Sequence, residues 1–212
     1  MKFKDRCDAG IQLASHLKQY EQDPEAIVIA LPRGGVVIGD ILAQKLRLPL
    51  DVICPKKVTS IYQPEYALGA VTEKGHFILN PKALQQLKLK KEDLIPQIDR
   101  QQKEAARRLQ LYRQNRPARQ LKGKRVLLVD DGIATGLTME AAIKTAREEQ
   151  AAQIILVVPV APPSSLRHLA SQVDATICLI QDPDFMAVGC YYESFSQVSD
   201  DEVIALMHHR NS

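Results

Sequence analysis

The sequence predicts an α/β protein built around a parallel β-sheet that is flanked by helices. The first observation is a set of continuous apolar runs, which lie at residues 26–32, 50–55, 125–130, 152–160 and 175–180. These runs are rich in Val, Ile and Leu, as are parallel strands that are covered on both faces. The second is that helical patterns separate several of the runs. The third is a composition of 45% hydrophobic and 5% aromatic residues without Trp, which requires a mostly aliphatic core.

The first half of the chain begins with an expected helix. Residues 4–20 carry Ile11, Leu13 and Leu17 at roughly helical spacing. The elements predicted after it are a strand in AIVIALP (26–32), a helix in GGVVIGDILAQKL (34–46) and a strand in LDVICP (50–55).

The second half of the chain repeats the pattern. A strand is predicted in RVLLVD (125–130), followed by a helix in TGLTMEAAIKTAREEQ (135–150). Two further strands are expected in AQIILVVPV (152–160) and ATICLI (175–180). Strands that alternate with helices in this way form parallel sheets through crossover connections.

Two regions interrupt this alternation. Residues 56–80 form a long connection with Gly, Pro, Tyr and mixed charge, and connections of that length are often functional lids. Residues 91–119 are expected to form one long solvated helix, with seven Arg and Lys residues between Arg100 and Arg119. No clear linker divides the chain, so residues 1–212 are expected to form a single domain.

The composition excludes several classes of protein. The net charge of +3 is too small to indicate a nucleic-acid partner by itself. No run of about 18 apolar residues predicts a membrane span, and the N-terminus lacks the apolar core of a signal peptide. The four cysteines and five histidines show no metal-ligand spacing, so we expect free thiols in the cytoplasm and no metal site made by the protein alone.

The stretch VLLVDDGIATGLTM (126–139) indicates a ligand site. Asp130 and Asp131 follow a buried strand, so both carboxylates lie at the edge of the sheet where ligands bind in open α/β folds. Two neighbouring carboxylates accept hydrogen bonds well from two neighbouring hydroxyls, such as a ribose diol. Gly132 permits the tight turn that follows.

The same loop can hold a phosphate. It presents backbone N–H groups and two hydroxyls at the start of a helix, which is an anion site, through Ala134, Thr135, Gly136 and Thr138. A diol and a phosphate a few ångströms apart describe a ribose 5-phosphate. The competing phosphate motifs GxxxxGK[ST] and GxGxxG are absent, and an EF-hand would need further oxygen ligands.

The run VLLVDDGIATGLTM resembles the phosphoribosyl-pyrophosphate (PRPP) signature of the type I phosphoribosyltransferases. The similarity extends over nearly the whole chain and includes ALPRGGVVIG, PEYALGAVTEKG and FMAVGCYYESFSQVSDDEV, as in a free-standing family of phosphoribosyltransferases. It implies the type I fold, with a small hood and a flexible lid at about residues 58–76.

LPRGG (31–35) follows the first sheet strand. Gly34 and Gly35 let the backbone approach a ligand closely, and Arg33 adds a fixed positive charge. The resemblance implies that this loop holds the pyrophosphate, often with unusual peptide geometry. It also implies that a basic residue near the end of the second strand reaches the pyrophosphate, for which Lys56 and Lys57 are candidates and Lys57 is preferred.

The resemblance implies further site residues. The lid would bring Glu65 or Glu73 to the reacting centre, and Glu65 is the candidate for proton transfer. A flat pocket for the acceptor is implied near the C-terminus, at Phe185, Val188, Tyr191 and Tyr192. Ordinary core packing explains each of these four residues equally well.

The implied reaction transfers 5-phosphoribose from PRPP to a nitrogen nucleophile and releases pyrophosphate. Catalysis would rest on Asp130, Asp131, Arg33, Lys57 and Glu65, with Mg²⁺ arriving mainly on the pyrophosphate. The resemblance also implies a homodimer, because proteins of this family usually form one. Ala134 stands where 6-oxopurine enzymes carry an aspartate, which disfavours hypoxanthine and guanine as acceptors without establishing adenine.

Other functions stay open at this stage. A PRPP-binding regulator could keep the site with little or no catalysis, and the basic stretch 100–119 is the feature that could serve nucleic acid. The low net charge and Glu104 within the stretch disfavour nucleic acid. A hydrolase that destroys PRPP is a further alternative.

Overall fold

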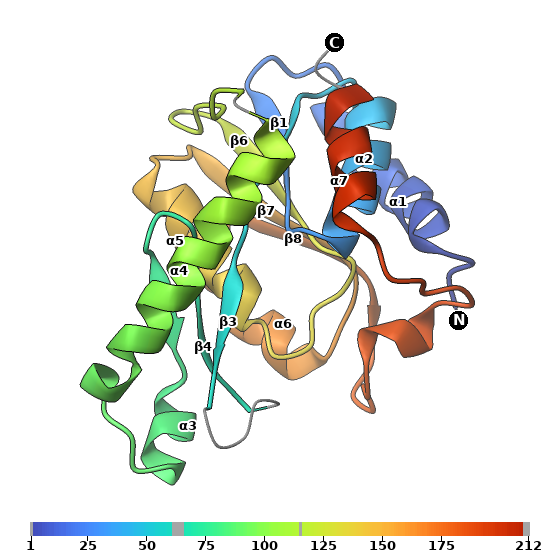
Figure 1. Cartoon of the computed structure of the whole chain (residues 1–212). Helices are drawn as coiled ribbons and strands as arrows, with labels where there is room; N and C mark the ends of the chain where they lie inside the picture. Colours follow the sequence, from blue (N-terminus) through green and yellow to red (C-terminus); the bar gives the residue numbers. More distant parts are fainter. Residues whose placement is uncertain (1, 61–65, 115, 210–212) are drawn as a thin grey trace.

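The main body of the molecule is a five-stranded parallel sheet (Figure 1). The computed structural model describes residues 2–60, 66–114 and 116–209. From one edge to the other, the strands are β2 (Leu50–Val52), β1 (Ala26–Ala30), β6 (Arg125–Val129), β7 (Gln153–Ala161) and β8 (Ala175–Gln181). The predicted parallel sheet with flanking helices is therefore confirmed.

Helices cover both faces of this sheet. On one face, Val28 and Ala30 pack with the helices α1 (Arg6–Ser15), α2 (Gly34–Leu46) and α7 (Asp200–His209). On the other face, Ile27 and Ile29 pack with α5 (Leu137–Glu148) and α6 (Pro163–Ala170). Successive side chains of a strand point to opposite faces, so two buried faces require unbroken apolar strands.

The register of the two central strands sets the position of the loops that follow them. Ala30 of β1 is paired with Val129 of β6, so both strands end at the same level. The Leu31 N–H then donates to the Val129 carbonyl oxygen over 2.9 Å. Residues 32–35 and 130–131 consequently emerge side by side at the carboxyl edge of the sheet.

The long connection predicted for residues 56–80 contains a second, antiparallel sheet. Its strands are β3 (Lys56–Thr59), β4 (Ala67–Val71) and β5 (Phe77–Leu79). The helices α3 (Pro81–Gln86) and α4 (Lys91–Arg113) follow it and share a small apolar core with it. Ala70 of β4 packs on Leu137 and Ala141 of α5, which attaches this sheet to the main body. Residues 61–65, between β3 and β4, lie outside the described part of the chain.

Three predicted elements end earlier than expected. The helix predicted for 91–119 ends at Arg113, because Gln114 is left-handed with φ 46° and Pro117 follows. The strand predicted for 50–55 ends at Val52 ahead of Pro55, so the two lysines begin β3 instead of ending β2. The first helix ends at Ser15, and a separate 3-10 turn, η1, spans Lys18–Tyr20.

Helix α2, which begins at the PRGG loop, ends on a strained residue. Arg47 is exposed and left-handed, with φ 54° and ψ 47°. Arg47→Gly should raise the free energy of unfolding by about 0.5–1 kcal/mol, because glycine adopts this conformation without a Cβ penalty. Urea denaturation measures the change. Lys45→Gly, in the last turn of the same helix, is the control and should lower stability by roughly 0.5–1 kcal/mol; equal effects of both variants would refute the explanation.

Candidate functional site

The PRGG loop and the aspartate pair are in direct contact. A Cβ atom at Gly34 would lie 1.8 Å from Asp131 Oδ2. One at Gly35 would lie 2.9 Å from Asp130 Cα and 3.0 Å from the Val129 carbonyl oxygen. No larger residue fits at either position without moving the aspartates. The peptide bond between Pro32 and Arg33 is cis, which confirms the unusual geometry expected in this loop.

Asp131 is held by an arginine that the sequence did not reveal. Arg6 Nε donates to Asp131 Oδ2 over 2.8 Å, with both side chains largely buried. Arg6 Nη1 donates to the Ser196 carbonyl oxygen, and its guanidinium lies 3.9 Å from the Phe195 ring centroid. These contacts join α1, the aspartate loop and the C-terminal segment. Arg6 is 125 residues from Asp131 in the chain, so no local motif points to it.

The two aspartates differ in their surroundings. Burial raises the pKa of Asp130 well above its usual range, and the neighbouring charge of Asp131 raises it further. Burial also raises the pKa of Asp131, but the Arg6 guanidinium opposes that rise. The Asp131 backbone N–H donates to Asp130 Oδ1 over 2.8 Å. The Asp130 carboxylate therefore has one backbone hydrogen bond but no ion-pair partner among the described residues, and ligand hydroxyls could stabilise it further.

A pocket of about 190 Å³ opens beside Asp130. It is lined by Lys57, Asp130, Gly132, Ile133, Ala134, Thr135, Gly136, Thr138 and Val188. The structure thus brings together every residue predicted for the ribose and phosphate except Asp131, which does not line the pocket and is bound by Arg6.

The floor of the pocket is the start of α5. Gly136 caps this helix with φ +82°, and the first N–H groups of any helix lack partners within the helix. The loop is anchored on both sides: the Ile133 N–H donates to the Val160 carbonyl oxygen, and Ser165 Oγ donates to that of Ala134 over 2.6 Å. A rigid loop ending in free N–H groups suits an anion such as phosphate.

The two candidate lysines have different surroundings. Lys57 lines the Asp130 pocket, whereas Lys56 lines a groove against α4 together with Arg100, Lys103, Glu104 and Arg107. They are consecutive residues of β3, so their side chains point to opposite faces. The pKa of Lys56 is lowered by burial and then by the charge of Arg108. Of the two lysines, only Lys57 lines the pocket that contains Asp130.

Arg33 does not line the Asp130 pocket. Its Nη1 lies 3.6 Å from Asp200 Oδ1 at the start of α7. Asp200 also accepts a 2.7 Å hydrogen bond from the Tyr112 hydroxyl of α4. Arg33 therefore contributes positive charge near the PRGG loop without reaching Asp130 in this structure.

The four residues predicted for the acceptor pocket do not all lie at the Asp130 pocket. Val188, in the 3-10 turn η2 (Val188–Tyr191), lines the pocket, and its Cγ1 lies 2.6 Å from where a Cβ of Gly132 would stand. Phe185 and Tyr191 stack on each other with ring centroids 5.5 Å apart and do not line it. The buried Tyr192 donates its hydroxyl hydrogen to the Asp131 carbonyl oxygen over 2.6 Å. Tyr192 therefore supports the aspartate loop.

Of the two candidate lid acids, only Glu73 lies in the described part of the chain. Glu65 lies outside the described residues, so its role stays a prediction. Glu73 does not line the Asp130 pocket, and its Oε2 accepts a hydrogen bond from the Cys54 backbone N–H over 3.0 Å. Burial raises the pKa of Glu73.

Together, the parallel sheet, the acidic pair ending a central strand and the loop opening the next helix define a protein of the type I phosphoribosyltransferase fold. The family model of the phosphoribosyl transferase domain matches residues 5–194, so the chain belongs to that family.

Similar proteins support this assignment. The crystal structure of TT1426 from Thermus thermophilus has a TM-score of 0.82 and 38% sequence identity, with 99% of each chain covered. Two Mycobacterium tuberculosis proteins, provisionally named as phosphoribosyl transferases, are each 38% identical over 205 residues. That match covers 97% of this chain and 46% of the relative, so the chain spans about half the length of these curated relatives. No helix in the described residues has the length and apolarity to cross a membrane.

The opposite surroundings of the aspartates predict opposite effects on stability. Asp130→Asn should raise the free energy of unfolding at pH 7 by roughly 0.5–2 kcal/mol, because it removes a desolvated charge. A raised pKa means that the folded state binds more protons than the unfolded state. The wild-type penalty therefore grows as pH rises above about 4, and the gain should shrink toward that pH.

Asp131→Asn is the matched control. It leaves the buried Arg6 without its carboxylate partner, so it should lower stability by about 1–3 kcal/mol. Urea denaturation at pH 7 and pH 5 measures both variants. Changes of the same sign in the two variants would contradict this account of the pair.

Proposed function

We propose that the chain transfers 5-phosphoribose from PRPP to a nitrogen nucleophile and releases pyrophosphate. The observation that carries the proposal is the 190 Å³ pocket, which joins a carboxylate, a helix start and a lysine. These three features match the diol, the 5-phosphate and the leaving group of one molecule. The chain's membership of the phosphoribosyl transferase domain family supports this assignment.

The pocket suggests one orientation for PRPP. The 5-phosphate would meet the N–H groups and hydroxyls between Thr135 and Thr138. The ribose hydroxyls would donate to Asp130, and the pyrophosphate would extend toward Lys57 and the backbone of Gly34 and Gly35. Asp131 would act mainly by fixing the loop, because Arg6 already occupies its Oδ2.

The residues would act by positioning and by electrostatics. Breaking the anomeric bond builds positive charge on the ribose, as in glycoside hydrolysis. The Asp130 carboxylate would stabilise that charge, and hydrogen bonds from the ribose hydroxyls would favour its ionised form. Lys57 would stabilise the negative charge on the departing pyrophosphate.

Magnesium belongs to the proposal as a partner of the pyrophosphate. In the described part of the chain, no group of three or more His, Cys, Asp or Glu side chains could hold a metal ion. Asp130 alone fits an ion that keeps several waters and takes phosphate oxygens. Bound Mg²⁺ would neutralise charge on the leaving group.

The acceptor would enter beside Ala134 and Val188, which line the pocket. The Ala134 methyl group cannot exchange a proton with a purine ring, so hypoxanthine and guanine are disfavoured. The stacked Phe185 and Tyr191 would support the acceptor side from behind Val188. A homodimer, which the resemblance implies, and a cytoplasmic location, which the isolated cysteines indicate, complete the proposal. Light scattering coupled to size exclusion tests the assembly.

The direct test is pyrophosphate release from PRPP and Mg²⁺ with a panel of adenine, uracil, hypoxanthine, guanine and simple amines. Acceptor-dependent release by wild type should fall by about 10²–10³ in Asp130→Asn, because a preorganised charge is lost. Release without any acceptor would indicate a hydrolase. Tight PRPP binding with no release would favour a PRPP-binding regulator.

The two lysines provide a matched comparison. Lys57→Met should lower kcat/KM for PRPP by about 10–100-fold, because charged hydrogen bonds contribute roughly 1.5–3 kcal/mol. Lys56→Met removes the same charge from the other face of β3 and should change kcat/KM less than about threefold. Steady-state kinetics with varied PRPP measures both. A larger effect at Lys56 would place the pyrophosphate in the α4 groove instead.

A further inference from the structure

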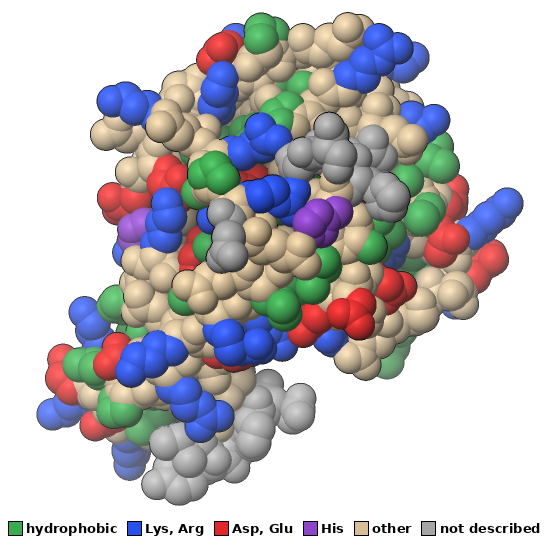
Figure 2. Space-filling model, turned by 45° about the horizontal axis from the view of Figure 1, so that its top comes forward, with side chains coloured by type: hydrophobic (Ala, Val, Ile, Leu, Met, Phe, Trp, Pro, Cys, Tyr) green, Lys and Arg blue, Asp and Glu red, His purple; other side chains and the backbone are tan. Residues whose placement is uncertain are grey.

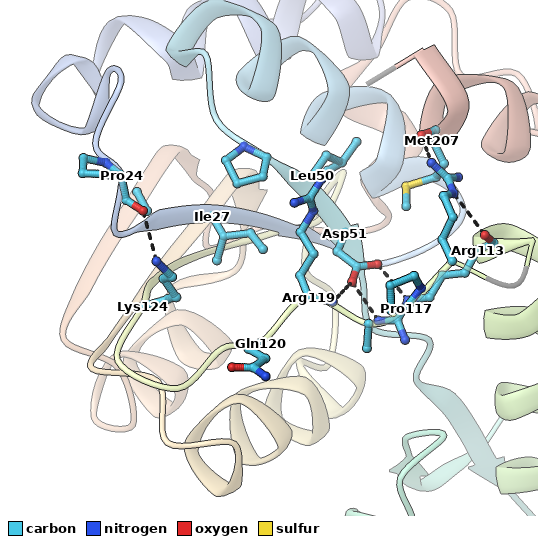
Figure 3. Close-up of a pocket in the computed structure, with 14 residues that line it drawn as sticks. Pro24, Ile27, Leu50, Asp51, Arg113, Pro117, Arg119, Gln120, Lys124 and Met207 are labelled. Atoms are coloured by element: carbon cyan, nitrogen blue, oxygen red, sulfur yellow. Dashed lines mark hydrogen bonds and ion pairs between the residues drawn. The ribbon is translucent and has the colours of Figure 1, made fainter. Parts of the chain in front are cut away.

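A second cavity, of about 590 Å³, lies at the opposite edge of the sheet from the Asp130 pocket. It is formed by the amino-terminal ends of β1 and β2, by the segment after α4 and by the end of α7. Figure 3 shows its lining arranged around one hollow, with Pro24 and Lys124 on one side and Arg113 and Met207 on the other. The two cavities share no lining residue.

The cavity carries excess positive charge. Four cationic side chains line it, and they belong to Arg113, Arg116, Arg119 and Lys124. Lys124 is already paired over 3.2 Å with Glu25, which does not line the cavity. The one lining carboxylate, Asp51, is already engaged: it accepts two 2.9 Å hydrogen bonds from the Arg113 guanidinium and a third from the Arg119 backbone N–H. In the view of Figure 2, with the top of Figure 1 turned forward, Lys and Arg side chains are spread over the whole face, and some of them lie near its middle.

Arg116 lines the cavity without a carboxylate partner among the described residues. Its Nε and Nη1 donate to the backbone carbonyl oxygens of Arg113 and Met207 over 3.1 and 3.0 Å. Its Nη2 is buried and has no acceptor among the described residues. No carboxylate in the described part of the chain forms an ion pair with Arg116. A buried guanidinium N–H without an acceptor is unfavourable, so an incoming anion would supply what the protein lacks.

Apart from Gln120, the remaining walls are apolar, and three of their residues are prolines. Pro24, Pro49 and Pro117 line the cavity together with Leu50 and Ile27. Proline side chains lose little entropy when a ligand packs on them, because their rings are already fixed. The volume lies in the range of small-molecule sites, which combine apolar walls with a few placed polar groups.

We propose that this cavity is a binding site for a small phosphate monoester that carries a flat apolar ring. The phosphate accepts from Arg116 Nη2, and the side chain must turn to present this group because Nη2 is buried in the structure. The ring packs between the prolines. Arginine suits this ligand, because its planar fork donates two parallel hydrogen bonds to a phosphate. The site is independent of the reaction proposed above, since its lining is at the other edge of the sheet.

The test uses the full chain with ¹³C-methyl methionine and phenyl phosphate as the probe. Met207 lines the second cavity, whereas Met139 lies in the first turn of α5 next to the phosphate loop. Phenyl phosphate should shift the Met207 methyl signal in a saturable way in wild type. Phenol, which lacks the anion, should shift it at least tenfold more weakly at equal concentration.

Variants identify the anion contact. Arg116→Gln should weaken the Kd for phenyl phosphate at least tenfold, while Arg167→Gln on the exposed surface of α6 should leave it unchanged. Thermal unfolding checks that both variants are folded, and if Arg116→Gln is not, the wild-type comparison of phenyl phosphate with phenol decides. Equal shifts with phenol, an unchanged Kd in Arg116→Gln, or a shift confined to Met139 would each overturn the proposal.

Discussion

The site depends on one close approach, in which the backbone of Gly34 and Gly35 lies directly against Asp130 and Asp131. A carbon atom added at Gly34 would overlap the Asp131 carboxylate. The loops that follow two neighbouring strands therefore pack together without a side chain at Gly34 between them. The approach is set by the pairing of β1 with β6, which ends both strands at one level. Its consequence is a compact site in which the PRGG backbone lies next to the Asp130 carboxylate that lines the pocket.

Arg6 completes this arrangement from a distant part of the chain. By binding Asp131, the Ser196 carbonyl and the Phe195 ring, it ties the first helix and the C-terminal segment to the aspartate loop. The ion pair partly offsets the cost of burying Asp131, whereas Asp130, beside the pocket, has no such partner among the described residues. The fold thus bears a larger burial cost at Asp130 than at Asp131, as is common where a charge is kept for a ligand.

The same sheet presents two kinds of edge. At the carboxyl edge, carboxylates and a helix start suit a sugar phosphate. At the amino edge, prolines and arginines surround a cavity in which Arg116 has one buried N–H without an acceptor among the described residues. The basic residues after Arg100 therefore belong to two different surfaces. Arg107 lines the groove that contains Lys56, while Arg113 and Arg116 line the second cavity. This division explains a basic stretch without requiring nucleic acid.

The sequence by itself determined the parallel sheet, most of its strands and the aspartate loop, because unbroken apolar runs and a strand–loop–helix motif are local signals. Tertiary structure decided which charges meet. Arg6 reaches Asp131 only through folding, Lys56 and Lys57 separate because their strand joins a second sheet, and α4 stops at Gln114 because of a left-handed backbone. Phe185 and Tyr191 carry the same aromatic signal as a ligand wall, yet they stack on each other. The Arg6–Asp131 pair spans 125 residues and leaves no periodicity in the chain, so only the folded protein shows it.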